Sequence, residues 1–99
     1  MQVGFKDDDL QNFYERKKNK LRFSSSVQNQ FIVKVNLLRA ASDLRAVYSL
    51  AGSLRFEKLS EKKYKGKYSI RVNEQRRAII DLQENAVITL VLEEITDYH

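Results

Sequence analysis

Apolar residues follow two different spacings along the chain, and the change between them separates a helical part from a strand-rich part. After residue 24, apolar side chains recur every three to four positions, which is the spacing of one face of an α-helix. After Gly52, apolar and polar residues alternate, which is the period of a β-strand. The pattern therefore predicts a single α+β domain over residues 1–99, in which two helices precede most of the strands.

The first part of the chain carries two helix starts. Three acids at residues 7–9 suit the positive end of a helix dipole, and Asp8 with Gln11 resembles a capping box. Ser25 with Gln28 repeats this pattern before a second helix of about 15 residues. We interpret the apolar stripe of this second helix as core packing; it consists of Val27, Phe31, Val35 and Leu38.

The strands are expected to form one small antiparallel sheet. Residues 43–52 show neither spacing and are interpreted as a connection. Consecutive strands joined by short connections predict a sheet of three to five strands, with both helices on one face and the other face partly open. The predicted strands cover residues 3–5, 54–59, 68–72, 77–82 and 86–95.

The turn after Val72 decides which arginines share a face of the sheet. A two-residue turn would place Arg71 opposite Arg76, whereas a three-residue turn over residues 73–75 would place it opposite Arg77. We favour the second register, because it gathers the apolar residues of both strands on one face. Two arginines directly opposite each other repel. A phosphate between them would remove that repulsion, although two solvated arginines that splay apart remain an alternative.

Composition limits the possible partners and chemistry. Lys and Arg outnumber Asp and Glu by 18 to 13, which gives a net charge of +5 and favours a polyanion, although a merely soluble basic protein fits the same numbers. The absence of cysteine excludes disulfides and thiolate catalysis, and a single histidine argues against structural zinc. Neither a signal peptide nor a membrane span is expected, so we predict a cytoplasmic protein.

The last three residues are the strongest candidates for chemistry. Asp97 and His99 are two positions apart, so an extended chain points both to one face, and Tyr98 adds a ring on which a base can stack. RNA cleavage by the 2′-hydroxyl needs a base, an acid and cations at the phosphate. Histidine suits either proton transfer, and Arg71 with Arg77 suits the phosphate. This route uses neither a metal nor a cofactor.

At these positions the chain resembles the HigB toxins of bacterial toxin–antitoxin systems, within the RelE/ParE superfamily. The resemblance spans nearly the whole chain and is densest from Leu54 onward. It is carried by residues 3–6 with Leu10, residues 54–59, residues 66–73, Arg77 and residues 97–99.

The resemblance implies a RelE-like toxin that cuts messenger RNA on the translating ribosome. It implies a helix-turn-helix antitoxin of the HigA kind as partner, with operator DNA reached through that antitoxin. The catalytic residues would be Arg71, Arg77, Asp97, Tyr98, His99 and Glu57. RNA contacts, including ribosomal RNA, would come from Lys58, Lys62, Lys63, Lys65, Lys67 and Arg76, with further basic residues at 16–22.

The chain departs from the family pattern beside the site. Some members have a histidine within the segment matching residues 54–59, where this chain offers Glu57 as a base and Lys58 as a cation. A glycine expected soon after Leu59 is replaced by residues 60–63. Two alternatives stay open: a gyrase inhibitor of the ParE type, which needs no catalytic tail, and a plain nucleic-acid-binding module.

Overall fold

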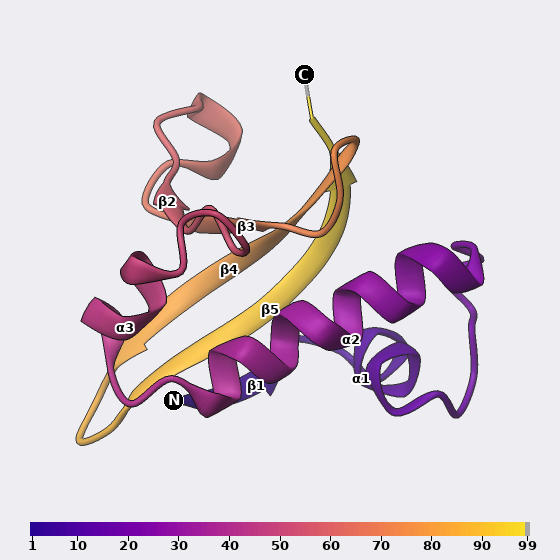
Figure 1. Ribbon diagram of the computed structural model, residues 1–99, viewed down its shortest axis with the longest axis horizontal. Coiled ribbons are helices and arrows are strands. Elements are labelled where there is room, and N and C mark those ends of the chain that lie inside the picture. The colour runs from indigo at the N-terminus through magenta and orange to yellow at the C-terminus, as the bar shows by residue number, and fades with distance from the viewer. Residues whose placement is uncertain (99) are drawn as a thin grey trace.

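Five strands form a single sheet in the computed structural model, which describes residues 1–98. Their order is β1-β5-β4-β3-β2, and all neighbours are antiparallel except β1, which runs parallel to β5. Figure 1 shows the helices of residues 8–15 and 25–40 on one side of this sheet and the connection between β2 and β3 on the other. The strands are β1 (Gln2–Phe5), β2 (Glu57–Lys58), β3 (Tyr68–Arg71), β4 (Arg76–Glu84) and β5 (Ile88–Asp97).

The two predicted helices are present, each capped one residue before the predicted position. Helix α1 (Asp8–Glu15) begins after Asp7, whose carboxylate accepts from the Leu10 amide at 2.9 Å. Helix α2 (Ser25–Ala40) begins after Ser24, whose hydroxyl oxygen accepts from the Val27 amide at 3.2 Å. Asp7 and Ser24 have extended backbones, which is the conformation of a residue just before a helix.

A third helix, α3 (Leu44–Ser49), occupies the segment interpreted from the sequence as a connection. Its first turn is capped by Asp43, whose carboxylate accepts from the Ala46 amide at 2.9 Å. Six residues are too few to reveal a helical period, so the pattern alone missed this helix. None of the helices described here is long and apolar enough to cross a membrane.

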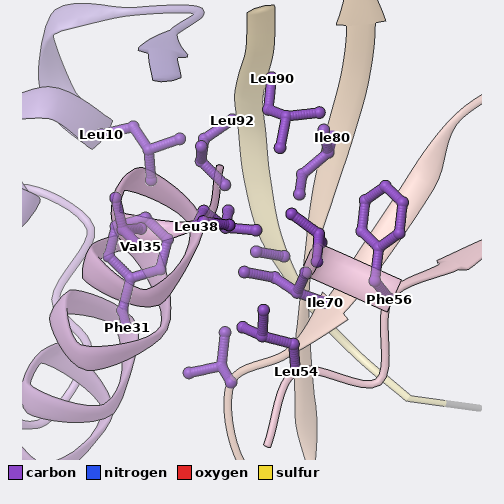
Figure 2. Packing of buried hydrophobic residues seen from close by; sticks show 14 of the residues in the cluster. Leu10, Phe31, Val35, Leu38, Leu54, Phe56, Ile70, Ile80, Leu90 and Leu92 are labelled. Atoms are coloured by element: carbon purple, nitrogen blue, oxygen red, sulfur yellow. The ribbon is translucent and has the colours of Figure 1, made fainter. Parts of the chain in front are cut away.

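The hydrophobic core lies between α2 and the sheet. The apolar stripe predicted on α2 is buried, and Figure 2 shows Phe31, Val35 and Leu38 facing side chains that project from the strands. Fully burying a side chain of this size stabilises the fold by about 1.5–3 kcal/mol. The interpretation of this stripe as core is therefore confirmed; its partners include Ile70, Ile80, Leu90 and Leu92.

The strand predicted over residues 54–59 is much shorter in the structure. Arg55 has a positive φ of 50°, which an extended strand cannot contain, so β2 is confined to Glu57–Lys58. Leu54 and Phe56 on either side of Arg55 are buried in the core. The alternating pattern was correct about burial but wrong about backbone conformation.

The hairpin between β3 and β4 adopts the register predicted with a three-residue turn. Arg71 pairs with Arg77, and Ile70 pairs with Ala78. The carboxamide oxygen of Asn73 accepts from the amides of Gln75 and Arg76 at 2.9 and 2.8 Å, and these bonds hold the turn closed. The two arginines therefore lie opposite each other on the face that the helices do not cover, which we call the arginine face.

Residues 59–67, which we call the cover segment, lie over part of the arginine face. The segment contains the short 3₁₀ helix η1 (Lys62–Tyr64). Leu59 and Ile79 are buried, yet both lie outside the hydrophobic cluster that α2 covers. The face predicted to be partly open is thus partly closed by the chain itself.

Candidate functional site

Arg71 and Arg77 hold different positions although they pair directly. Arg71 is half-buried, and its Nη2 donates to the carbonyl oxygen of Gly52 at 3.0 Å. Its backbone amide donates to the carbonyl of Leu54 at 2.7 Å. These two bonds tie β3 to the loop that carries Arg55. Arg77, in contrast, is only 5% exposed.

The guanidinium of Arg77 is enclosed by a carboxylate and two aromatic rings. Its Nη1 and Nη2 donate to the two carboxylate oxygens of Glu61 at 2.7 and 2.8 Å. The rings of Tyr64 and Tyr98 lie 5.5 and 5.9 Å from its central carbon. The hydrogen bonds that Arg77 donates to Glu61 raise the pKa of Arg77 further, so this cation stays charged.

The expected repulsion between the arginines is therefore relieved from within the chain. Glu61 neutralises Arg77, and the Gly52 carbonyl accepts from Arg71. The prediction that both arginines lie opposite each other on one face is confirmed by the register. The prediction that they hold a phosphate stays a prediction.

Tyr98 reaches the arginine face from the end of β5. Its backbone amide donates to the carbonyl of Gln75 at 2.9 Å, which fixes the chain beside the β3–β4 turn. Burial raises the pKa of its hydroxyl, and the negative charge of Glu57 acts in the same direction. Arg55, Arg71 and Arg77 oppose this rise, so the net effect keeps the phenol protonated at neutral pH.

Glu57 shares the arginine face, and Lys58 does not. Glu57 pairs with Ser69, which lies two residues before Arg71 and therefore on the same side of the sheet. Lys58 pairs with Tyr68, and its ammonium nitrogen lies 6.0 Å from the centre of that ring. Of this predicted pair, the structure brings only Glu57 to the arginine face.

Asp97 is also turned away from the arginine face. It pairs with Arg76, and its Oδ1 lies 3.5 Å from the Nε of that residue. The guanidinium of Arg76 lies 5.2 Å from the ring of Phe23, on the helical side. Neither Asp97 nor Arg76 therefore joins Arg77 and Tyr98, and the predicted residue His99 lies outside the described residues.

The predicted RNA-binding lysines fall into two groups. Lys62, Lys63 and Lys65 are exposed on the cover segment, where their charges are available to a partner. Lys67 is held by Glu93 at 3.0 Å and by Asp81 at 3.3 Å. The hydrogen bonds that Lys67 donates to these two acids raise its pKa, so its charge is already paired within the fold.

Sequence reasoning missed three residues of this site: Arg55, Glu61 and Tyr64. Arg55 was counted as part of a regular strand, and nothing in the alternating pattern indicates its left-handed backbone. Glu61 belongs to the stretch that departs from the family pattern, which was a signal of an unusual local structure. The contacts of Glu61 and Tyr64 depend on how the cover segment folds back, and spacing does not report such a fold.

No group of three or more metal-binding side chains occurs within residues 1–98. The arginine face gathers cations and groups that can carry a proton. The assembled groups are Arg55, Glu57, Arg71, Arg77 and Tyr98. Three cations, a carboxylate and a protonated phenol on one surface can bind a phosphate and move a proton beside it.

Comparisons with known proteins agree on one family. A family model described as a RelE-like toxin of the type II toxin–antitoxin system HigB matches residues 3–99. The chain is 38% identical over 96 residues to Toxin HigB-1 of Vibrio cholerae serotype O1, covering 94% of this chain and 96% of that protein.

Two solved structures have the same fold. The YoeB/ParE toxin from Agrobacterium tumefaciens matches with a TM-score of 0.58 and 15% identity over the full length of both chains. The YoeB-YefM complex from Staphylococcus aureus matches with a TM-score of 0.58 and 19% identity, covering 100% of this chain and 97% of that one. At these identities the similarity establishes the architecture alone.

Proposed function

Because this chain belongs to the HigB-like toxins of type II toxin–antitoxin systems, we propose that it is an endoribonuclease that cleaves messenger RNA on the ribosome. Toxins of the HigB and RelE kind are generally ribonucleases. The observation that carries the proposal is the gathering of Arg71, Arg77, Glu57 and Tyr98 on one face. Action on the ribosome implies a cytoplasmic protein.

The proposed reaction uses the 2′-hydroxyl of the RNA as nucleophile. A base removes its proton, the 2′-oxygen bonds to the adjacent phosphorus, and the bond from phosphorus to the 5′-oxygen breaks. The products are a 2′,3′-cyclic phosphate and a 5′-hydroxyl, whose oxygen takes a proton from an acid. The arginines stabilise the charge that develops on the phosphate, and the protonated hydroxyl of Tyr98 donates to it.

Glu57 and His99 are the two proton carriers in this proposal. Removing a general acid or base costs roughly a hundredfold or more in rate. We therefore expect Glu57→Gln and His99→Ala each to lower the cleavage rate by about that factor. In the wild type, the cleavage rate should rise with pH in the acidic range as the base loses its proton. The variant without the base should lack this rise, so the pH profile shows whether Glu57 or His99 is the base.

Asp97 supports this function by positioning the end of β5. Its pairing with Arg76 holds the end of β5 against the β3–β4 turn, and the amide of Tyr98 follows directly. The basic side chains Lys62, Lys63 and Lys65 extend from the same face and are suited to ribosomal RNA. Such contacts predict that binding weakens steeply with salt.

The proposed partner of this toxin is a protein antitoxin of the helix-turn-helix, HigA-like kind, which would also bring the complex to operator DNA. Two findings support it: the family is defined by toxin–antitoxin pairs, and one structural neighbour is a YoeB-YefM complex. Coexpression with the antitoxin should abolish growth inhibition and yield a stable complex that gel filtration detects.

The proposal is tested with purified ribosomes and a defined messenger RNA. Arg71→Ala should reduce cleavage by roughly a hundredfold, because one phosphate-stabilising donor is lost. Arg45→Ala removes an exposed arginine of α3 and should leave cleavage unchanged. RNA ends are mapped by primer extension and tested for a cyclic phosphate.

Two outcomes would contradict this function. Unchanged cleavage by both Arg71→Ala and Glu57→Gln would exclude the arginine face as the catalytic site. Intact messenger RNA together with altered DNA supercoiling would instead favour gyrase inhibition.

A further inference from the structure

The carboxylate of Glu61 accepts from both terminal nitrogens of Arg77. A carboxylate and a phosphate present the same pair of oxygens to an arginine, and both are bound through two parallel N–H bonds. Here the two bonds measure 2.7 and 2.8 Å, so the end of the guanidinium formed by Nη1 and Nη2 is already used. The remaining surfaces of the guanidinium face the rings of Tyr64 and Tyr98.

The carboxylate that pairs with Arg77 lies on the cover segment and is partly exposed to solvent. The side chain of Glu61 is 47% exposed, whereas that of Arg77 is 6% exposed. Glu61 immediately precedes η1 on the cover segment, and its side chain makes no capping bond to that helix. The segment is closed at its base by the Leu59 amide, which donates to the carbonyl of Lys67 at 2.8 Å.

We propose that Glu61 acts as an internal substitute for the RNA phosphate, which must displace it to reach Arg77. This inference rests on the proposed function, since it concerns the same phosphate and the same arginine. In the absence of RNA, Glu61 keeps a buried arginine paired and so avoids an uncompensated buried charge. When RNA binds, the phosphate takes over the two N–H donors and Glu61 turns to solvent with the cover segment.

This arrangement lowers the affinity of the toxin for free RNA. The measured dissociation constant equals the intrinsic constant divided by the fraction of molecules in which Arg77 is available. Removing the charge of Glu61 raises that fraction. We expect Glu61→Gln to tighten RNA binding by roughly three- to tenfold, because an amide is a weaker partner for arginine than a carboxylate.

The experiment measures binding rather than cleavage. The probe is a fluorescent RNA hexanucleotide with a 2′-O-methyl group at every position, which removes the nucleophile and prevents cleavage. Fluorescence anisotropy gives the dissociation constant for the wild type, Glu61→Gln, Arg77→Lys and Glu94→Gln. Thermal unfolding confirms that each variant is folded.

Glu94→Gln is the matched control for Glu61→Gln. It removes the same charge from the same face, and Glu94 accepts from the hydroxyl of Tyr64, so it also holds the cover segment. It makes no ion pair with Arg77 among the described contacts. Glu61→Asp provides a second variant that keeps the charge but shortens the side chain, and its affinity should fall between those of the wild type and Glu61→Gln.

The outcomes separate the competition from the proposed function. Tighter binding by Glu61→Gln than by Glu94→Gln supports the competition. Weaker or unchanged binding by Glu61→Gln, with weaker binding by Arg77→Lys, overturns the competition while leaving phosphate at Arg77. Equal tightening by Glu61→Gln and Glu94→Gln shows a general charge effect and also overturns it. If Arg77→Lys binds the RNA as tightly as the wild type, Arg77 does not hold the phosphate. Both the competition by Glu61 and the role of Arg77 in the proposed function are then wrong.

Discussion

On the helical face of the sheet, apolar side chains of α2 meet apolar side chains of the strands, whereas on the arginine face the cover segment is fastened mainly by charges. The first contact is non-directional and is stronger the more apolar area it buries. The second depends on ion pairs such as that of Arg77 with Glu61 and that of Lys67 with Glu93, and on the bond from Tyr64 to Glu94. The helical face therefore stabilises the fold, whereas the ion pairs on the arginine face can be replaced by ion pairs with a partner.

The largest difference between the faces is expected in their response to cavities. Leu38→Ala, within the core under α2, should lower the free energy of unfolding by about 4 kcal/mol, because its fully enclosed site collapses poorly. Leu59→Ala, under the cover segment, should cost about 2 kcal/mol, because the segment can settle into the space. Urea denaturation measures both, and equal losses would mean that the cover segment is as firmly packed as the core.

A smaller effect is expected at Arg55, whose left-handed backbone costs about 1–2 kcal/mol in a residue other than glycine. Arg55→Gly relieves that cost but adds freedom to the unfolded chain, so stability should change by less than about 1 kcal/mol. If Arg55 supplies charge to the site beside Tyr98, messenger RNA cleavage should fall roughly tenfold.

Arg22→Gly is the matched control for this change. Arg22 is also an exposed arginine with a positive φ, here 59°, but it precedes α2, far along the chain from the arginine face. Its replacement should change stability by a similar amount. Because Arg22 belongs to the basic stretch 16–22 predicted to contact RNA, cleavage should fall, but by less than in Arg55→Gly. Equal loss of cleavage in both variants would point to a general effect of net charge.

The smallest effect is expected at Lys67, which is held by Glu93 and Asp81. Its pKa is raised in the folded state, so its stabilising contribution is present below the unfolded value of about 10.4 and is lost as pH rises through the folded value. Lys67→Met should cost at most about 1 kcal/mol at pH 7. The difference from the wild type should disappear in strongly alkaline solution and shrink in high salt, as measured by urea denaturation at several pH values.

The sequence predicted the helical face better than the arginine face. The spacing of Val27, Phe31, Val35 and Leu38 determines which side of α2 is buried, because a helix fixes the direction of each side chain. Strand alternation likewise gave the register that pairs Arg71 with Arg77. These are local geometric rules, and they hold wherever the backbone is regular.

The rest of the site depends on irregular backbone, and no spacing rule applies there. Arg55 interrupts a strand that its neighbours predict, and Glu61 reaches Arg77 only because the cover segment folds back over the sheet. The tail illustrates the same limit. The prediction assigned Asp97 and Tyr98 to one catalytic site, whereas the structure places Asp97 beside Arg76 and Tyr98 beside Arg77.

The parallel pairing of β1 with β5 has a consequence for how the molecule is made. A chain is synthesised from its N-terminus, so β1 leaves the ribosome long before its neighbour in the sheet has been synthesised. Because β5 lies between β1 and β4, the sheet cannot close until this late strand emerges. The amide of Tyr98 is fixed to Gln75 later still. The sheet of a nascent chain is therefore incomplete until β5 has been synthesised, and the arginine face takes its final form only after that strand has joined its neighbours.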